Sequence, residues 1–234
     1  MKKIQIEGFE MYVREKEANG LHNGICEPDE TALIKQLIKP DWVCMDIGAN
    51  IGYFTILMAQ LCKHVYAFEP EPSNFEMLKQ NVALNKGDVI LYKEAVGDKN
   101  GTMPLYLCST DNGMHRLYKS KWCNPTTDTY VYCTQLDEYK FPKINLIKMD
   151  IEGAEYGALH GMVELLIKDH PLLILEFHPM SIKEYGVDPK KVYQFLIKLG
   201  YKISLIPNIY QNCSYEGLYT MTNDQSGGQN ILCQ

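Results

Sequence analysis

The sequence predicts an α/β fold in which helices cover both faces of a mostly parallel sheet. Short apolar runs typical of buried strands alternate with amphipathic segments along most of the chain, which is the pattern of such a sheet. Residues 43–55 predict a buried strand, a turn bracketed by glycines and the start of a helix. About twenty residues later, residues 64–69 predict a second strand that ends in an acid, as in nucleotide-binding α/β folds.

The composition places the chain among ordinary globular proteins. It has 234 residues, 46% hydrophobic and 22% charged, with a net charge of -6, which disfavours non-specific binding to nucleic acids. The first residues lack the apolar core of a signal peptide, and no apolar run approaches the roughly 18 residues of a membrane span. The 8 cysteines form no C-x-x-C pair. We therefore expect free thiols and a cytoplasmic location, with no membrane span.

The first half of the chain predicts a regular alternation of strands and helices. Residues 1–25 predict one or two short strands or an irregular lead-in, and a helix opens at 27–31 and runs through 38. Strands are expected at 43–47, 64–68 and 88–93, with helices at 53–62 and 73–85 between them. We divide the chain into a lead-in of residues 1–40 and a ligand-binding domain of residues 41–234.

The second half interrupts this alternation before resuming it. Within residues 98–134, Gly101 predicts a hairpin turn and the polar stretch 109–129 predicts a loop, and a long insert of this kind is more often functional than accidental. Strands are then expected at 144–149 and 172–177, with a helix ending near 168 between them. A helix at 189–199 ends at Gly200. Residues 201–206 and the tail 217–233 predict a closing antiparallel pair.

The glycine turn indicates the kind of ligand. A dinucleotide-binding turn has the pattern G-x-G-x-x-G, whereas this chain has Asp46, Gly48, Asn50 and Gly52 at alternate positions and lacks the middle glycine. An acid on the first strand suits an ammonium group better than a phosphate. Glu69, at the end of the second strand, can accept hydrogen bonds from ribose hydroxyls. A cofactor with an amine, a ribose and no phosphate satisfies these features, and S-adenosylmethionine (SAM) is such a cofactor. The alternative is a turn that merely connects strand to helix.

Acids also gather at the expected ends of two later strands. Asp150, Glu152 and Glu155 follow the strand at 144–149, where they either raise one another's pKa or cap the following helix. Glu176 and His178 follow the next strand, and a histidine can take a proton near neutral pH. Asp150, Glu176 and His178 have donor atoms suited to a divalent ion. Nothing in the sequence requires that ion, so we expect no metal.

These segments together resemble the FkbM-type methyltransferases. The resemblance covers residues 25–180 and rests on the motifs at 46–55, 68–70, 148–155 and 176–178, with Asn81 and Asn85 between them. It implies SAM as cofactor and a Rossmann-like class I methyltransferase fold, with a mostly parallel seven-stranded sheet and an antiparallel last strand. It also implies a set of cofactor-binding residues: Asp46, Gly48, Ala49, Asn50 and Gly52 at the methionine part, Glu69 at the ribose, Ala95 and Val96 beside the adenine, and Asp150.

Members of that family are mostly O-methyltransferases that act on hydroxyls of sugars, lipids or polyketide products. The resemblance therefore implies a small-molecule or glycan acceptor, with Asp150 or His178 as the base and Glu152 and Glu176 as orienting groups. Residues of the loop at 109–129 are expected to shape the acceptor pocket: Asn112, His115, Arg116, Tyr118 and Trp122.

Three other functions share features of this sequence. N-methyltransferases of amines or nucleic acids usually carry an Asn/Asp-Pro-Pro-aromatic turn, which residues 150–153 lack. A non-catalytic module would bind the cofactor without transfer. A nicotinamide-dependent oxidoreductase would need the missing middle glycine.

Overall fold

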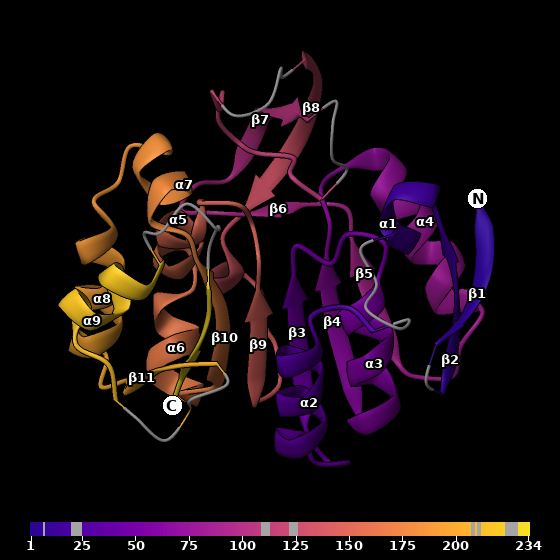
Figure 1. Cartoon of the computed structure of the whole chain (residues 1–234), viewed down its shortest axis with the longest axis horizontal. Helices are drawn as coiled ribbons and strands as arrows, with labels where there is room; N and C mark the ends of the chain where they lie inside the picture. The colour runs from indigo at the N-terminus through magenta and orange to yellow at the C-terminus, as the bar shows by residue number, and fades with distance from the viewer. Residues whose placement is uncertain are drawn as a thin grey trace.

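A seven-stranded sheet forms the centre of the part of the chain that the structure describes (Figure 1). The structure is a computed structural model, and it describes residues 1–6, 8–19, 25–108, 113–121, 126–206, 209, 212–222 and 229–234. Its elements, in chain order, are β1 (Lys2–Ile6), β2 (Phe9–Val13), α1 (Glu15–Asn19), α2 (Pro28–Leu37), β3 (Val43–Ile47), α3 (Tyr53–Leu61), β4 (His64–Phe68), α4 (Pro72–Ala83), β5 (Val89–Tyr92), β6 (Ala95–Val96), β7 (Gly101–Leu107), β8 (Thr126–Thr134), the 3-10 helix η1 (Leu136–Glu138), β9 (Leu146–Met149), α5 (Glu155–His160), α6 (Val163–Asp169), β10 (Leu172–Phe177), α7 (Pro179–Glu184), α8 (Pro189–Lys198), β11 (Ile203–Leu205), α9 (Tyr215–Thr222) and β12 (Gln229–Cys233).

The sheet has the strand order β11-β12-β10-β9-β3-β4-β5. The strands β10, β9, β3, β4 and β5 are parallel, whereas β12 runs antiparallel to both of its neighbours. This arrangement confirms the class I methyltransferase fold. The strands expected at 43–47, 64–68 and 172–177 have the predicted bounds, because each is an apolar run buried between helices.

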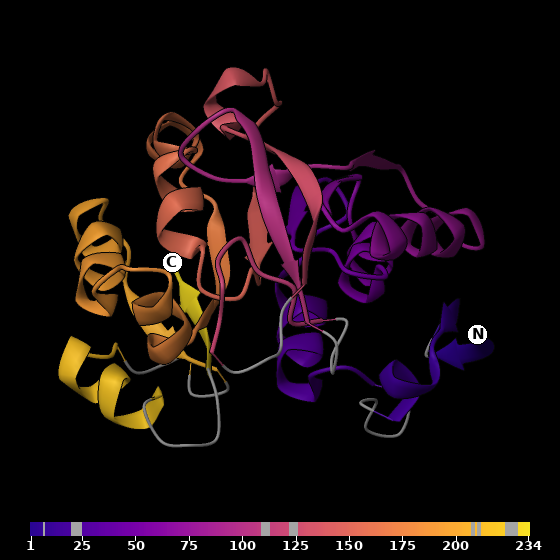
Figure 2. The ribbon, with the colours of Figure 1, turned by 90° about the horizontal axis from the view of Figure 1, so that it is seen from above.

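Helices cover both faces of the sheet, as the sequence predicts (Figures 1 and 2). On one face, Cys44 and Leu146 pack with Ile34 of α2 and Ile56 of α3. On the other face, strand residues pack against side chains of α5, α6 and α8: Met45, Ile147, Leu173, Leu159, Leu166 and Leu196. Because side chains alternate along a strand, the polar residues Asp46 and Lys148 follow the face of α2 and α3.

Two asparagine side chains, one in α4 and one just after it, attach the N-terminal hairpin of β1 and β2. Asn81 accepts the Tyr12 N–H at 2.7 Å and donates to its carbonyl at 3.0 Å. Asn85 does the same for Glu10, at 3.0 and 2.8 Å. Asn85 lies two residues beyond the end of α4 and donates to the Asn81 carbonyl at 2.7 Å, so the two side chains lie together and supply the hydrogen bonds that a neighbouring strand would supply. Apolar residues of the hairpin share a core cluster with α3, and the division at residue 40 stays a prediction.

A small sheet of β6, β8 and β7 lies beyond the carboxyl ends of the central strands (Figure 1). Here the sequence-based prediction was partly wrong. Gly101 is not a hairpin turn but the first residue of β7, paired with Cys133, and β8 begins within the loop expected at 109–129. The face of β7 and β8 that carries Leu105 and Val131 is buried, and it packs against Ala95 of β6.

The helices of the second half differ from the prediction in three further ways. The helix expected to end near 168 is divided into α5 and α6. The sequence gave no indication of α7, and α9 occupies the first part of the tail expected to be extended. The antiparallel pair of β11 and β12 is confirmed. In the described part of the chain, no helix combines the length and the apolar character needed to span a membrane.

Candidate active site

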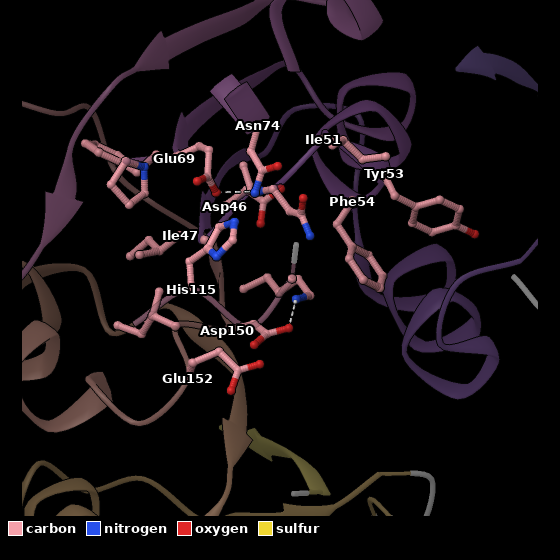
Figure 3. A pocket seen from close by; sticks show the side chains of 18 of the residues that line it. Asp46, Ile47, Ile51, Tyr53, Phe54, Glu69, Asn74, His115, Asp150 and Glu152 are labelled. Atoms are coloured by element: carbon pink, nitrogen blue, oxygen red, sulfur yellow. Dashed lines mark hydrogen bonds and ion pairs between the residues drawn. The ribbon is translucent and has the colours of Figure 1, made fainter. Parts of the chain in front are cut away.

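A cavity of about 650 Å³ opens at the carboxyl ends of β3, β4 and β9 (Figure 3). This volume is typical of sites that bind small molecules or cofactors. Residues of β2 and α1 close it on one side, among them Met11, Val13 and Glu17. Residues of β6, β7 and the segment 113–117 close it on the other: Ala95, Val96, Leu105, Gly113, His115 and Leu117. The predicted cofactor residues therefore line one cavity, except Gly52, which is not among the described residues that line it.

The glycine turn between β3 and α3 is shaped by contacts within the protein. Gly48 has φ +86°, and a Cβ there would lie 1.9 Å from the carbonyl oxygen of Asp150. Gly52 has φ +99°, and its Cβ would lie 2.6 Å from Leu78 Cδ1 on α4. The sequence placed these glycines in a turn that binds a ligand. In the structure, they let the turn pack against the Asp150 turn and α4, so that the turn is held firmly at the cavity.

Glu69 is fixed beside this turn by two backbone groups. It is 5% exposed, and its carboxylate accepts the N–H of Asn50 and the N–H of Glu71, both at 2.8 Å. Burial raises the pKa of Glu69 to about 7, although the two N–H donors oppose the shift. Each carboxylate oxygen retains a second lone pair, so Glu69 can still accept hydroxyl groups of a ligand.

Asp46 lies on β3 beneath the turn, where it is 1% exposed. Its Oδ2 accepts the hydroxyl hydrogen of Thr55 at 2.5 Å. Burial raises the pKa of Asp46, whereas the charge of Lys148 and the hydrogen bond from Thr55 lower it. Ala49, Ala95 and Val96 add apolar wall to the same cavity.

Asp150 and Glu152 bring two further carboxylates to the rim. Asp150 Oδ2 lies 3.3 Å from Lys148 Nζ, and Glu152 Oε2 lies 2.6 Å from a guanidinium nitrogen of Arg116. Neither of them caps the following helix through its side chain. Glu155, the first residue of α5, instead ties back the preceding turn, because its Oε1 accepts the N–H of Gly153 at 3.1 Å.

Glu176 and His178, on and after β10, lie behind this rim. Carboxylate oxygens of Asp150, Glu152 and Glu176 lie within 4.8 Å of one another. Burial, then the charges of Asp150 and Glu152, raise the pKa of Glu176 well above its usual range, and its Oε2 has no hydrogen-bond partner among the described residues. His178 caps α7, where its Nδ1 accepts the N–H of Ser181 at 3.2 Å. It is not among the described residues that line the cavity.

The expected substrate loop reaches the site through residues 113–121. His115 and Leu117 line the cavity, and His115 points into it (Figure 3). Arg116 is 3% exposed and binds Glu152 and the Ser120 hydroxyl, while the Tyr118 hydroxyl donates to the Glu152 carbonyl. Asn112 and Trp122 lie outside the described residues.

Sequence reasoning assigned no role to four charged residues that line the cavity: Glu17, Glu27, Glu94 and Lys148. Lys148 is buried on β9, and Glu27 lies at the start of α2, where burial raises its pKa to about 7. Glu27 has φ +41°, Asn50 φ +50° and Glu152 φ +58°. Such backbone conformations are uncommon for residues other than glycine and often mark functional sites. The signal for Lys148 was present, since a lysine inside an otherwise apolar strand is unusual.

The charges of the cavity suit a cationic ligand. Among the described residues that line it, one is a lysine and seven are acids: Glu17, Glu27, Asp46, Glu69, Glu94, Asp150 and Glu152. The Oδ1 atom of Asn50 is buried and has no hydrogen-bond partner in the described structure. A ligand with an amine and hydroxyl groups would satisfy these acceptors.

Comparison with known proteins identifies the family. The model described as the methyltransferase FkbM domain matches residues 46–203. The chain belongs to the FkbM methyltransferase family.

The names of two curated relatives describe the methyl acceptor or the position that is methylated. The hexuronic acid methyltransferase AglP of Haloferax volcanii is 30% identical over 173 residues, which cover 73% of this chain and 67% of AglP. The 2-O-methyltransferase NoeI of Sinorhizobium fredii is 26% identical over 156 residues, 58% of this chain and 63% of NoeI. The chain thus spans about two thirds of the length of these curated relatives.

Solved structures agree with the FkbM fold. An FkbM methyltransferase from Methylobacillus flagellatus KT superposes with a TM-score of 0.51 and 14% identity over 87% of this chain and 50% of that chain. SMU.1697c of Streptococcus mutans, solved in complex with SAH, superposes with a TM-score of 0.52 and 13% identity over 95% of this chain and 99% of that chain. At these identities the likeness concerns the fold alone.

Proposed function

We propose that this FkbM protein is a SAM-dependent O-methyltransferase that acts on a hydroxyl of a sugar, a glycolipid or a secondary metabolite. One observation carries the proposal: the acid-lined cavity at the glycine turn continues at Asp150 and Glu152 into a cluster of carboxylates. A cofactor site and a group that can accept a hydroxyl proton are thereby adjacent.

The cavity residues divide between the parts of the cofactor. Asp46 would bind the ammonium group and Glu69 the ribose hydroxyls, with Gly48, Ala49, Asn50 and Gly52 around the methionine part. The apolar side chains of Ala95 and Val96 would flank the adenine. When bound, SAM supplies an electrophilic methyl group on a sulfonium, and the protein has to orient an acceptor oxygen toward it.

Asp150 is the residue best placed to accept the hydroxyl proton. Asp150 and Glu152 both line the cavity, but Glu152 forms a 2.6 Å ion pair with Arg116, whereas Asp150 Oδ2 lies 3.3 Å from Lys148 Nζ. Glu176 is not among the described residues that line the cavity. His178 is less suited than we expected from the sequence. Its Nδ1 accepts an N–H, so the neutral ring carries its proton on Nε2 and cannot take another there. Burial and the charge of Arg116 lower the pKa of His178, which favours that neutral form. Glu152 would then orient the acceptor, and Glu176 would position the carboxylates of Asp150 and Glu152.

The name of AglP, a hexuronic acid methyltransferase, supports a sugar as the acceptor class, and the name of NoeI, a 2-O-methyltransferase, supports transfer to an oxygen. The segment 113–121 would form one wall of the acceptor site through His115 and Leu117. We also propose a reducing compartment such as the cytoplasm, since the seven cysteines that the structure describes are all free thiols.

Cofactor binding and transfer can be tested separately. In titration calorimetry, Glu69→Ala should weaken SAM binding about 10- to 100-fold, because charge-assisted hydrogen bonds are lost. The control Glu76→Ala removes an exposed acid of α4 and should bind as the wild type does. His178→Ala should also retain affinity. Unchanged affinity in Glu69→Ala would refute the ribose assignment.

Transfer is measured with labelled SAM and a panel of neutral sugars, uronic acids and glycolipids. Asp150→Asn should lower turnover at least 100-fold on the accepted substrate. Labelling of amines or RNA, with no hydroxyl labelled, would instead favour an N-methyltransferase.

A further inference from the structure

Lys148 is a buried cation inside an acidic cavity. It is 3% exposed, its Nζ lies 3.3 Å from Asp150 Oδ2, and it lies 4.5 Å from the centre of the Phe54 ring. Burial alone would lower the pKa of Lys148, but the nearby charges of Asp150, Glu27 and Asp46 raise it above its usual range. The ammonium group is therefore retained in the folded protein. A fixed positive charge at this depth calls for an explanation, because lysines are rarely fully buried.

The sheet register places Lys148 beside Asp46. The two residues are direct partners in the parallel pairing of β3 with β9, and adjacent strands lie about 4.8 Å apart. Both side chains follow the sheet face covered by α2 and α3, and both line the cavity. An anionic position and a cationic position are thus adjacent on the cavity wall, one strand apart.

This pair matches the charges of an amino acid. The methionine part of SAM carries its ammonium and its carboxylate on the same carbon atom, so the groups that bind them must be neighbours. We propose that Lys148 binds the carboxylate of the methionine part, next to the ammonium bound by Asp46. This inference rests on the proposed use of SAM and assigns a role to a residue for which sequence reasoning found none.

Two other arrangements would give different results. In the first arrangement, Lys148 only neutralises Asp150 and supports the site without distinguishing one ligand from another. Alternatively, the first N–H groups of α3, which follow the turn at Gly52, would hold the carboxylate. A ligand that lacks only the carboxylate, measured on both the wild type and Lys148→Met, separates these arrangements from our proposal. If the N–H groups of α3 hold the carboxylate, the wild type still prefers SAM, but Lys148→Met binds SAM as the wild type does, and that result would overturn the role of Lys148.

Titration calorimetry with SAM, SAH and decarboxylated SAM provides that comparison. Decarboxylated SAM keeps the amine, the sulfonium, the ribose and the adenine, whereas SAH keeps the carboxylate and lacks the sulfonium charge. The wild type should bind decarboxylated SAM about 10- to 100-fold more weakly than SAM. Lys148→Met should weaken SAM and SAH by a similar factor while its affinity for decarboxylated SAM changes less than about 3-fold.

The controls keep a folding defect apart from a binding defect. Lys79→Met removes an exposed lysine of α4 and should leave all three affinities unchanged. Lys148→Arg retains the charge and should keep the preference for SAM over decarboxylated SAM. The wild-type preference needs no variant, so it remains informative if Lys148→Met unfolds, which a thermal melt would show.

The outcomes distinguish this inference from the proposed function. Equal wild-type affinity for SAM and decarboxylated SAM would overturn the role of Lys148 while leaving SAM as the cofactor. A Lys148→Met variant that loses the same factor for all three ligands would also overturn it, in favour of support for Asp150. If the wild type binds none of the three ligands, the proposed cofactor itself is wrong.

Discussion

Replacing Glu155 by glutamine should change how the stability of the protein depends on pH. Glu155 follows the acidic turn at the start of α5 and is 1% exposed. Its Oε1 accepts the N–H groups of Gly153 and Ile151, at 3.1 and 3.4 Å. Its Oε2 is buried without a hydrogen-bond partner among the described residues. Glutamine keeps the accepting oxygen and the shape but cannot ionise.

The size of the effect follows from the pKa of Glu155. Burial, opposed by the N–H donors, raises it from its ordinary value of 4.5 to about 7. Below pH 4.5 the carboxyl is protonated in both the folded and the unfolded chain. Between pH 4.5 and pH 7 the unfolded chain releases its proton while the folded protein keeps it, so stability falls as the pH rises. The linkage relation gives a loss of about 2.5 kcal/mol between pH 5 and pH 8, because one pKa unit corresponds to about 1.4 kcal/mol.

Urea denaturation followed by circular dichroism at pH 5, 6, 7 and 8 measures this effect. The free energy of unfolding of Glu155→Gln relative to the wild type should rise by about 2.5 kcal/mol across that range. Contributions from other buried acids cancel, since both proteins contain them. Glu164→Gln, at an exposed position of α6, should follow the wild-type profile. Parallel profiles for Glu155→Gln and the wild type would refute the assignment of a buried, partly unpaired carboxyl.

Three further substitutions test contacts around the cavity. Gly48→Ala would place a Cβ 1.9 Å from the Asp150 carbonyl oxygen in a backbone with φ +86°. Its free energy of unfolding should fall by at least about 2 kcal/mol, which a lower melting temperature would show. The control Gly217→Ala, within α9, should be neutral or stabilising. Asn81→Ala removes the bonds that hold the N-terminal hairpin and should cost about 2–4 kcal/mol, with faster amide exchange in β2. Arg116→Met leaves its carboxylate partner without a counter-ion and should cost about 3–5 kcal/mol in urea denaturation, and a loss below 1 kcal/mol would contradict the buried pair.

The sequence predicted those elements that neighbouring residues specify and missed those that depend on contacts with distant parts of the chain. Strands β3, β4 and β10 are apolar runs that stop at polar or glycine residues, so neighbouring residues alone predict their bounds. The start of β8 lies in a polar stretch, and its pairing with β7 forms the strand. The short helix α7 begins where His178 caps it, a signal too weak to predict from one histidine.

The same distinction separates the site residues that could be predicted from those that could not. Asp46, Glu69 and Asp150 could be predicted because each lies at or near the end of an apolar strand, and the ends of parallel strands meet at one edge of the sheet. Arg116 could not be assigned to Glu152, because 36 residues separate them in the chain and the contact depends on how the segment 113–121 crosses the site.

The sequence by itself determined the alternation of strands and helices, the edge of the sheet at which the cavity lies and four of the acids that line it. These features depend on hydrophobic periodicity and on the chemistry of neighbouring residues. The tertiary structure alone decided that Gly48 makes room for the Asp150 carbonyl, that Asn81 binds the hairpin and that Lys148 lies beside Asp46. Each of these depends on the register and packing of segments far apart in the chain, which no local pattern specifies.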